Sequence, residues 1–193
     1  MSEREPSPRA DLKSGTLYAV FGEAGWIYYG QVTPNKRVGF FRRRDRDMAS
    51  AADILSAPVM AVISINLPSI KRALRSRTWS KLGRFELACT LEKPWPMVWW
   101  SVGTLTVSVL EGVTEYDTRV EDPAIQNMER ASVLDAEHHI PARLTADFGE
   151  EEGDWNVGGP IWRERRISEE RARRFPDDPW CQLPPDWVWT NVS

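Results

Sequence analysis

Two runs of apolar and aromatic residues near the start of the chain, Thr16–Phe21 and Trp26–Thr33, are separated by only four residues. The separating segment, 22–25, has glycine at both ends, and glycine favours tight turns. Runs of this length and composition are typical of β-strands. The pattern predicts an antiparallel hairpin, and Gly30 within the second run predicts a bulge or a sharp bend, as in a curled sheet.

Further strand signals follow at intervals along the chain. The segments Arg37–Phe41, Val59–Ile65, Met97–Val102, Thr104–Val109 and Val113–Tyr116 are predicted strands. Val59–Ile65 is a continuous apolar run, which is typical of a buried strand, whereas Thr104–Val109 alternates between apolar and polar residues. Residues 42–47 are predicted to form a charged loop.

Helical signals are fewer. Helices are predicted at Ser50–Ser56, from Pro68 onwards with an end near Trp79–Gly83, from Asp122-Pro123 onwards, and at Ile167–Phe175. The sequence therefore predicts a mainly β (α+β) fold, with a strongly bent antiparallel sheet or a half-open small barrel and one or two peripheral helices. The 193 residues are expected to form a disordered tail at 1–14, a single β-rich domain at 15–175 and a Trp/Pro-rich strap at 176–193 packed on that domain.

The cysteines and the N-terminal region indicate a cytoplasmic protein. Cys89 and Cys181 lack metal-site spacing, so we interpret them as reduced, mostly buried thiols. The first 13 residues are polar, and the longest apolar run, Pro58–Ile65, is too short to span a bilayer. We therefore expect neither a signal peptide nor a membrane partner.

Catalytic motifs are missing from the sequence. It has no nucleophile elbow, no phosphate-binding glycine loop and no dinucleotide fingerprint. The two histidines, His138 and His139, are adjacent, with Asp135 nearby, and we interpret them as an exposed pair at the end of an element rather than a site. We predict no enzyme activity, cofactor, metal or small-molecule substrate.

The charges are segregated along the chain, although the net charge is only −3. Residues 36–93 contain 13 Lys and Arg against 5 Asp and Glu, whereas residues 111–154 contain 3 against 13. Such segregation can steer a charged partner, but the two regions can also face each other or form separate solvated surfaces. A homo-oligomer, with the basic half of one copy on the acidic half of another, is a further alternative.

Two sets of residues are candidates for binding a macromolecule. An indole beside carboxylates is typical of a hot spot for a basic partner. This interpretation predicts partner binding by Glu150, Glu151, Glu152, Asp154 and Trp155. Arginines interleaved with aromatic residues can instead contact phosphates and bases. This alternative predicts nucleic-acid binding by Lys36, Arg37, Arg42, Arg43, Arg44, Arg72 and Arg75.

Three stretches together resemble the immunity protein 26 family of bacterial polymorphic toxin systems. They are Gly15-Thr-Leu-Tyr-Ala-Val with Gly25-Trp-Ile-Tyr-Tyr-Gly-Gln-Val32, then Trp79-Ser-Lys-Leu-Gly83, and Gly159-Pro-Ile-Trp-Arg163. The resemblance covers about residues 14–165, and the acidic 111–154 stretch and the Trp-rich tail look like additions. It implies a β-rich fold with structural Phe and Trp positions and a non-catalytic function, the neutralisation of a cognate protein toxin.

Overall fold

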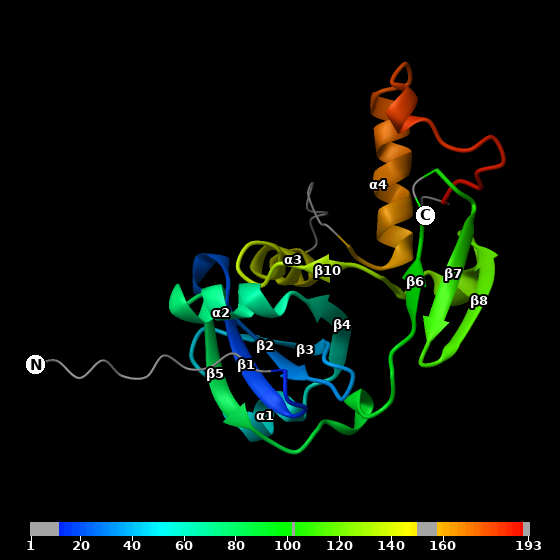
Figure 1. Cartoon of the computed structure of the whole chain (residues 1–193). Coiled ribbons are helices and arrows are strands. Elements are labelled where there is room, and N and C mark those ends of the chain that lie inside the picture. The colour runs from blue at the N-terminus through cyan, green and yellow to red at the C-terminus, as the bar shows by residue number, and fades with distance from the viewer. Residues whose placement is uncertain (1–11, 102, 150–157, 191–193) are drawn as a thin grey trace, which may run out of the picture. The chain divides into compact units, whose positions relative to one another are not determined.

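The computed structural model describes residues 12–101, 103–149 and 158–190 (Figure 1). The chain divides into two compact units. Unit 1 consists of Met1–Pro94 and Ser132–Val157, and unit 2 consists of Trp95–Ala131 and Gly158–Ser193. Each unit is therefore built from two separate segments of the chain.

Unit 1 contains a curled six-stranded sheet in the order β10-β4-β3-β2-β1-β5. Its strands are β1 (Thr16–Phe21), β2 (Ile27–Val32), β3 (Val38–Asp45), β4 (Val59–Ile65), β5 (Trp79–Arg84) and β10 (Val133–Leu134). Neighbouring strands are antiparallel except for β10, which runs parallel to β4. The predicted mainly β (α+β) fold with a bent sheet is confirmed.

The predicted hairpin is formed by β1 and β2, with the 3₁₀ turn η1 (Glu23–Gly25) between them. The predicted bulge is also present, because the register between β2 and β3 shifts between Tyr28 and Gly30. A Cβ atom on Gly30 would lie 2.7 Å from Val38 Cγ1 and 2.8 Å from the Phe40 ring. Glycine at this position therefore lets the Phe40 ring pack directly on the β2 backbone.

Two predictions about local structure are wrong. Residues 42–45 of the predicted loop belong to a strand, because β3 continues to Asp45 and pairs Arg44 with Tyr28. The segment Trp79–Gly83 is not the end of a helix but belongs to β5, which pairs with β1 so that Trp79 lies opposite Val20. The preceding helix ends at Arg75, and Arg77, at φ 61°, lies in the turn that leads into β5.

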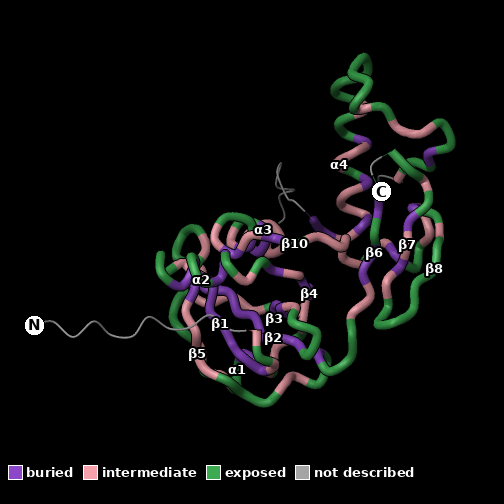
Figure 2. Tube along the Cα trace, in the orientation of Figure 1, coloured by how far each residue is buried: buried purple, intermediate pink, exposed green. Residues whose placement is uncertain are grey.

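Three α-helices of unit 1 pack on its sheet: α1 (Ala51–Leu55), α2 (Leu67–Arg75) and α3 (His139–Phe148). Figure 1 shows α2 and α3 on one side of the sheet and α1 on the other. Apolar side chains of α2 and α3, including Ile70 and Ile140, join one core with Tyr18, Phe40 and Trp79 of the sheet. The short 3₁₀ turn η2 (Cys89–Leu91) follows β5. Most of β1, β2 and the first half of β3 is buried (Figure 2).

Unit 2 contains a four-stranded sheet in the order β8-β7-β6-β9. Its elements are β6 (Met97–Trp99), β7 (Thr106–Glu111), β8 (Thr114–Arg119), η3 (Pro123–Ile125), β9 (Glu129–Arg130), α4 (Ile161–Arg174) and η4 (Pro179–Cys181). The helix predicted from Asp122 is only the 3₁₀ turn η3, and α4 starts at Ile161 rather than Ile167. The core of this unit includes Val107, Val109, Ile161 and Trp187.

Both cysteine thiols are free, but Cys89 is exposed and Cys181 half-buried, so the expected burial is wrong for Cys89. In the part of the chain that the structure describes, every helix is too short or too polar to cross a membrane.

Candidate functional site

The acidic loop that the sequence analysis favoured lies outside the described residues. Glu150, Glu151, Glu152, Asp154 and Trp155 follow α3 in the chain, within 150–157. Their role in binding a partner stays a prediction.

The basic residues of the nucleic-acid alternative are distributed over several surfaces of unit 1. Lys36 lies in the turn before β3, whereas Arg42 and Arg44 lie towards the end of that strand. Arg43, on the opposite face of β3 from its neighbours, forms an ion pair with Asp45 at 2.8 Å. Arg37 is partly buried, which lowers the pKa of its guanidinium. Arg75, by contrast, is exposed on α2.

Two arginines at and just after the end of β3, Arg44 and Arg46, stack on aromatic rings. The Arg44 guanidinium lies 4.4 Å from the ring centroid of Trp26 and 5.2 Å from that of Phe148. Arg46 lies 3.8 Å from the same Trp26 ring. These stacks hold the end of β3 against β2 and α3, which explains why an arginine-rich segment forms a strand.

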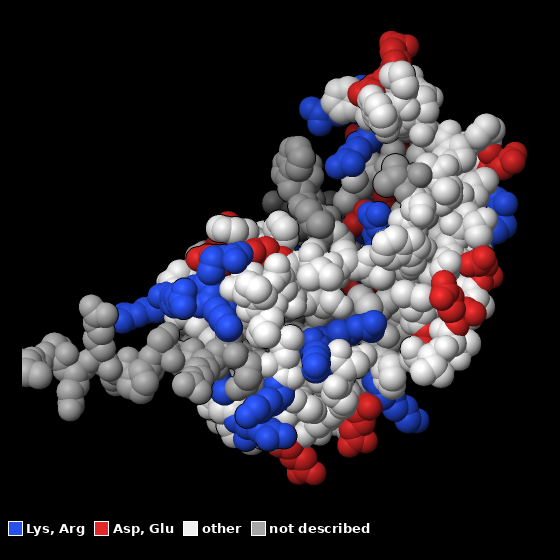
Figure 3. All heavy atoms as spheres, in the orientation of Figure 1, with Lys and Arg blue, Asp and Glu red and all other residues white. Residues whose placement is uncertain are grey.

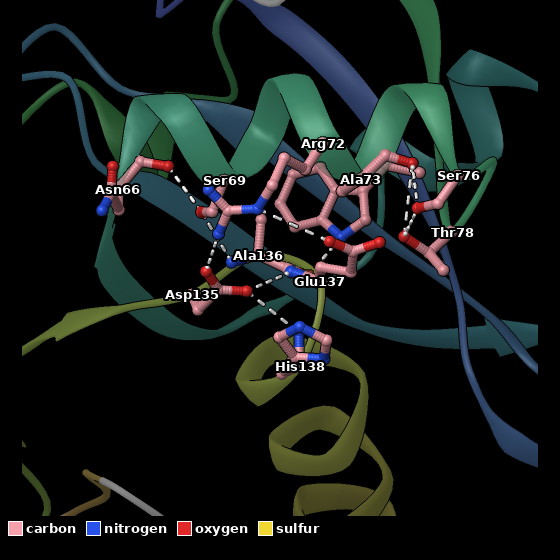
Figure 4. Close-up of polar contacts among 11 residues, drawn as sticks. Asn66, Ser69, Arg72, Ala73, Ser76, Thr78, Asp135, Ala136, Glu137 and His138 are labelled. Carbon is pink, nitrogen blue, oxygen red and sulfur yellow. Dashed lines mark hydrogen bonds and ion pairs between the residues drawn. The ribbon is translucent and has the colours of Figure 1, made fainter.

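Arg72 of α2 is engaged by carboxylates that come from the acidic stretch of the sequence (Figure 4). It forms ion pairs with Asp135 and, at 3.7 Å, with Glu137. Partial burial raises the pKa of Asp135, but hydrogen bonds from the backbone N–H groups of His138 and Glu137, together with the Arg72 charge, outweigh it and lower that pKa. At this point the basic and acidic regions of the chain face each other.

The two histidines are exposed at the start of α3. Nδ1 of His139 accepts a hydrogen bond of 3.1 Å from the backbone N–H of Asp135. The Asp135 carboxylate in turn binds backbone N–H groups, so this cluster closes the turn that leads into α3. Among the described residues, no group of three or more His, Cys, Asp or Glu side chains could hold a metal ion.

The connection between β10 and α3 is fastened to α2 and β5 by buried hydrogen bonds. The backbone N–H of Ala136 donates to Ser69 Oγ at 2.8 Å, and Trp79 Nε1 donates to the Ala136 carbonyl, also at 2.8 Å. Ser69 and Ala136 are fully buried and Trp79 nearly so. Trp79 belongs to the second stretch on which the resemblance rests, and its role here is structural.

An exposed face of the unit 2 sheet combines an indole with carboxylates. Trp99 of β6 lies opposite Ser108 of β7, and Ser108 lies opposite Asp117 of β8. Residues directly opposite each other share a face, and Glu115 lies on this face two positions before Asp117. The Trp99 side chain is 58% exposed. We call Trp99, Ser108, Glu115 and Asp117 the indole–carboxylate face.

The strand β8 forms the edge of this sheet and is exposed along almost its whole length (Figure 2). Ser108 Oγ donates a hydrogen bond of 2.7 Å to Asp117, which fixes one of the carboxylates. Figure 3 shows several Asp and Glu side chains gathered over β7 and β8. The face is therefore negatively charged, solvated and held on regular structure.

A second feature of unit 2 is a cleft of about 370 Å³ beside α4, which we call the tryptophan cleft. It is lined by residues that lie far apart in the sequence, among them Trp100, Trp180, Trp187, Arg171 and Leu183. Trp100 and Trp187 are stacked, with ring centroids 6.0 Å apart and an angle of 21° between the planes. Trp180 is 93% exposed.

The segment after η4 is held against α4 by a buried carboxylate. Glu169, which is 1% exposed, accepts hydrogen bonds from Trp187 Nε1 at 2.9 Å and from the Thr190 backbone N–H at 2.8 Å. Its other oxygen accepts from the Thr190 hydroxyl at 2.5 Å. These bonds fix Trp187, and through it the floor of the tryptophan cleft.

Comparison of the chain with protein-family models, with curated proteins and with solved structures finds no match.

Sequence reasoning missed both features of unit 2. Trp99 lies within the predicted strand Met97–Val102, but nothing in that run shows that its side chain points to the exposed side of β6. The alternation of Thr104–Val109 contained the necessary signal, because it identifies Ser108 as outward-facing. The tryptophan cleft has no comparable signal, since Trp100, Arg171 and Trp180 come from separate elements.

Proposed function

We propose that this chain is a non-catalytic immunity protein that binds and neutralises a protein toxin. The observation that carries the proposal is the indole–carboxylate face, where exposed Trp99 stands in line with Ser108 and Asp117 across three strands. Tryptophans account for an unusually large share of binding hot spots, and surrounding carboxylates favour a basic partner. Toxins that attack nucleic acids present basic surfaces, so they are suitable partners for such a face.

The resemblance to the immunity protein 26 family gives the proposal its specific form. The first two stretches on which it rests occupy β1, β2 and β5, and β1 pairs with both of the other strands. They therefore form one continuous part of the sheet in unit 1. The cognate toxin is expected from the neighbouring upstream reading frame, as a large secreted protein with a variable C-terminal domain.

The nucleic-acid alternative has less support. Arg43 and Arg72 already have carboxylate partners, and the remaining residues of that set are spread over β3, its preceding turn and α2. Retention of RNA or DNA on a filter at low salt would favour that alternative instead.

Co-expression tests the proposal. The C-terminal domain of the upstream protein should arrest growth of a bacterial host, and this chain should restore growth and co-purify with that domain. Failure of both readouts would overturn the proposed function.

Variants locate the binding face. Trp99→Ala and the pair Glu115→Lys with Asp117→Lys should each weaken the complex about thirtyfold or more, the effect of a hot spot worth ~2 kcal/mol. The matched controls are Trp189→Ala, another exposed indole in unit 2, and Asp47→Lys with Glu92→Lys, two exposed acidic residues in unit 1. Equal loss in variants and controls would show that the face is not specific.

A further inference from the structure

The tryptophan cleft has the size and wall chemistry of a small-molecule site. Its volume of about 370 Å³ falls within the range of roughly 300–1,000 Å³ that is usual for ligand pockets. The indoles of Trp100 and Trp187, which stack on each other and are 9% and 8% exposed, form with Leu183 an apolar part of the wall, and the 93% exposed indole of Trp180 also lines the cleft. An exposed indole favours a planar ring, because indole faces stack on aromatic groups.

One side of the cleft carries a cation that has no counterion among the described residues. Arg171 lies on the cleft side of α4, and no described carboxylate forms an ion pair with it. The other arginine of the cleft, Arg130, is already engaged, since it pairs with Glu164 at 3.6 Å and donates to the Trp100 carbonyl at 3.1 Å. Arg171 is therefore the group available for a bound anion.

The outer wall of the cleft is an aromatic side chain with a spare donor. Trp180 is 93% exposed, and no described residue accepts a hydrogen bond from its indole N–H. Its position in η4 is fixed from within the turn, because Asp178 accepts from the Trp180 backbone N–H at 2.9 Å. This bond fixes the backbone of η4, from which the Trp180 indole can cover a ligand in the cleft.

We propose that the tryptophan cleft binds a planar aromatic ring that carries one anionic group, with the size of a nucleoside monophosphate. The ring lies against the indoles and the anion pairs with Arg171. This site is separate from the indole–carboxylate face, and the proposal does not depend on the proposed function.

Calorimetric titration of the full chain tests this site directly. Adenosine 5′-monophosphate and indole-3-acetate serve as probes, because each combines a planar ring with an anion. Saturable binding of either probe supports the proposal, and the probe that binds more tightly distinguishes a nucleotide from an aromatic carboxylate. Adenosine lacks the anionic group and inorganic phosphate lacks the ring, so each should bind at least tenfold more weakly than the nucleotide. The proposed site would be overturned if neither probe saturated, or if adenosine or inorganic phosphate bound as tightly as the nucleotide.

Paired variants separate this site from general attraction to a basic helix. Arg171→Gln and Trp180→Ala should each weaken probe binding at least tenfold. Arg174→Gln, on the same helix but outside the cleft, and Trp99→Ala, at the indole–carboxylate face, should leave it unchanged. The assignment would be contradicted if Arg171→Gln and Trp180→Ala left probe binding unchanged, or if the two control variants weakened it equally.

Discussion

Trp79 Nε1 donates a 2.8 Å hydrogen bond to the backbone carbonyl oxygen of Ala136, although 57 positions separate these residues in the chain. Both groups are buried, so neither can exchange this bond for one to water. The indole also packs against Tyr18, with ring centroids 5.4 Å apart, and against Phe40 at 6.3 Å. A single side chain therefore joins the core of the sheet to the segment that leads into α3.

Replacement of Trp79 by phenylalanine tests this link. The variant keeps an aromatic ring but leaves the Ala136 carbonyl without its donor, which costs about 1–3 kcal/mol for a buried polar group. We expect the free energy of unfolding, measured by urea denaturation with far-UV circular dichroism, to fall by at least this amount. Trp99→Phe, at an exposed position, should have almost no effect. Equal stability of Trp79→Phe and the wild type would show that the hydrogen bond is dispensable.

The close contact at Gly30 predicts a steric effect. A methyl group added there meets Val38 and the Phe40 ring within 3 Å, so Gly30→Ala should destabilise unit 1 by about 1–3 kcal/mol. Because part of the clash is with the ring, the loss should be smaller when Gly30→Ala is introduced into a Phe40→Leu background. A double-mutant cycle of denaturation midpoints measures the difference, and strict additivity would argue against the proposed clash.

Asp135 makes stability depend on pH in the acid range. Its pKa is lowered in the folded protein by the backbone donors and Arg72, even though partial burial opposes them. Such a carboxylate stabilises the fold above its unfolded pKa of about 3.9, and this contribution is lost as the pH falls through the lower folded value.

The difference in stability between the wild type and Asp135→Asn should therefore be present at pH 6 and shrink below about pH 4. Thermal unfolding across that range provides the measurement, with the exposed Glu92→Gln as control. His138, His139 and Glu137 lie beside Asp135, and all three side chains are present in both proteins of each comparison. A difference that stays constant with pH would contradict the assignment to this carboxylate.

Glu169 and its neighbour Glu170 form a matched pair for the C-terminal segment. Glu169 is buried and accepts three hydrogen bonds, whereas the Glu170 side chain is 69% exposed. Glu169→Gln replaces a charged acceptor by an amide, which accepts the two N–H bonds more weakly and turns its NH2 group toward the Thr190 hydroxyl and Arg173, so it should destabilise unit 2 by about 1–3 kcal/mol. Hydrogen exchange should become faster at residues 183–190 in this variant and stay unchanged in Glu170→Gln. Unchanged protection in both variants would show that other contacts hold the segment.

Local patterns predicted those parts of the fold in which the signal lies within one segment. Turn glycines and aromatic runs identified β1 and β2, and the continuous apolar run identified β4. The arginines of β3 concealed its second half, because the stacking of Arg44 on Trp26 depends on a segment that is distant in the sequence. In β5 the Ser-Lys-Leu-Gly sequence has little intrinsic preference, and pairing with β1 determines its conformation.

The candidate sites were less predictable because their residues come together only through the pairing and packing of separate segments. The charge pattern along the chain showed an acidic stretch at 111–154, but it could not show which of its carboxylates share a face. The indole–carboxylate face requires the register of three strands, and the tryptophan cleft requires the packing of β6, α4 and η4.

The interleaved construction of the two units has a consequence for synthesis. When a ribosome has released residues 1–94, the sheet of unit 1 still lacks β10, and the segment that supplies it emerges only after residues 95–131. Unit 2 in turn waits for α4, which is made last of the four helices in the described chain. A truncated product that stops at residue 131 thus contains neither unit whole, and release of a folded protein depends on the final third of the message.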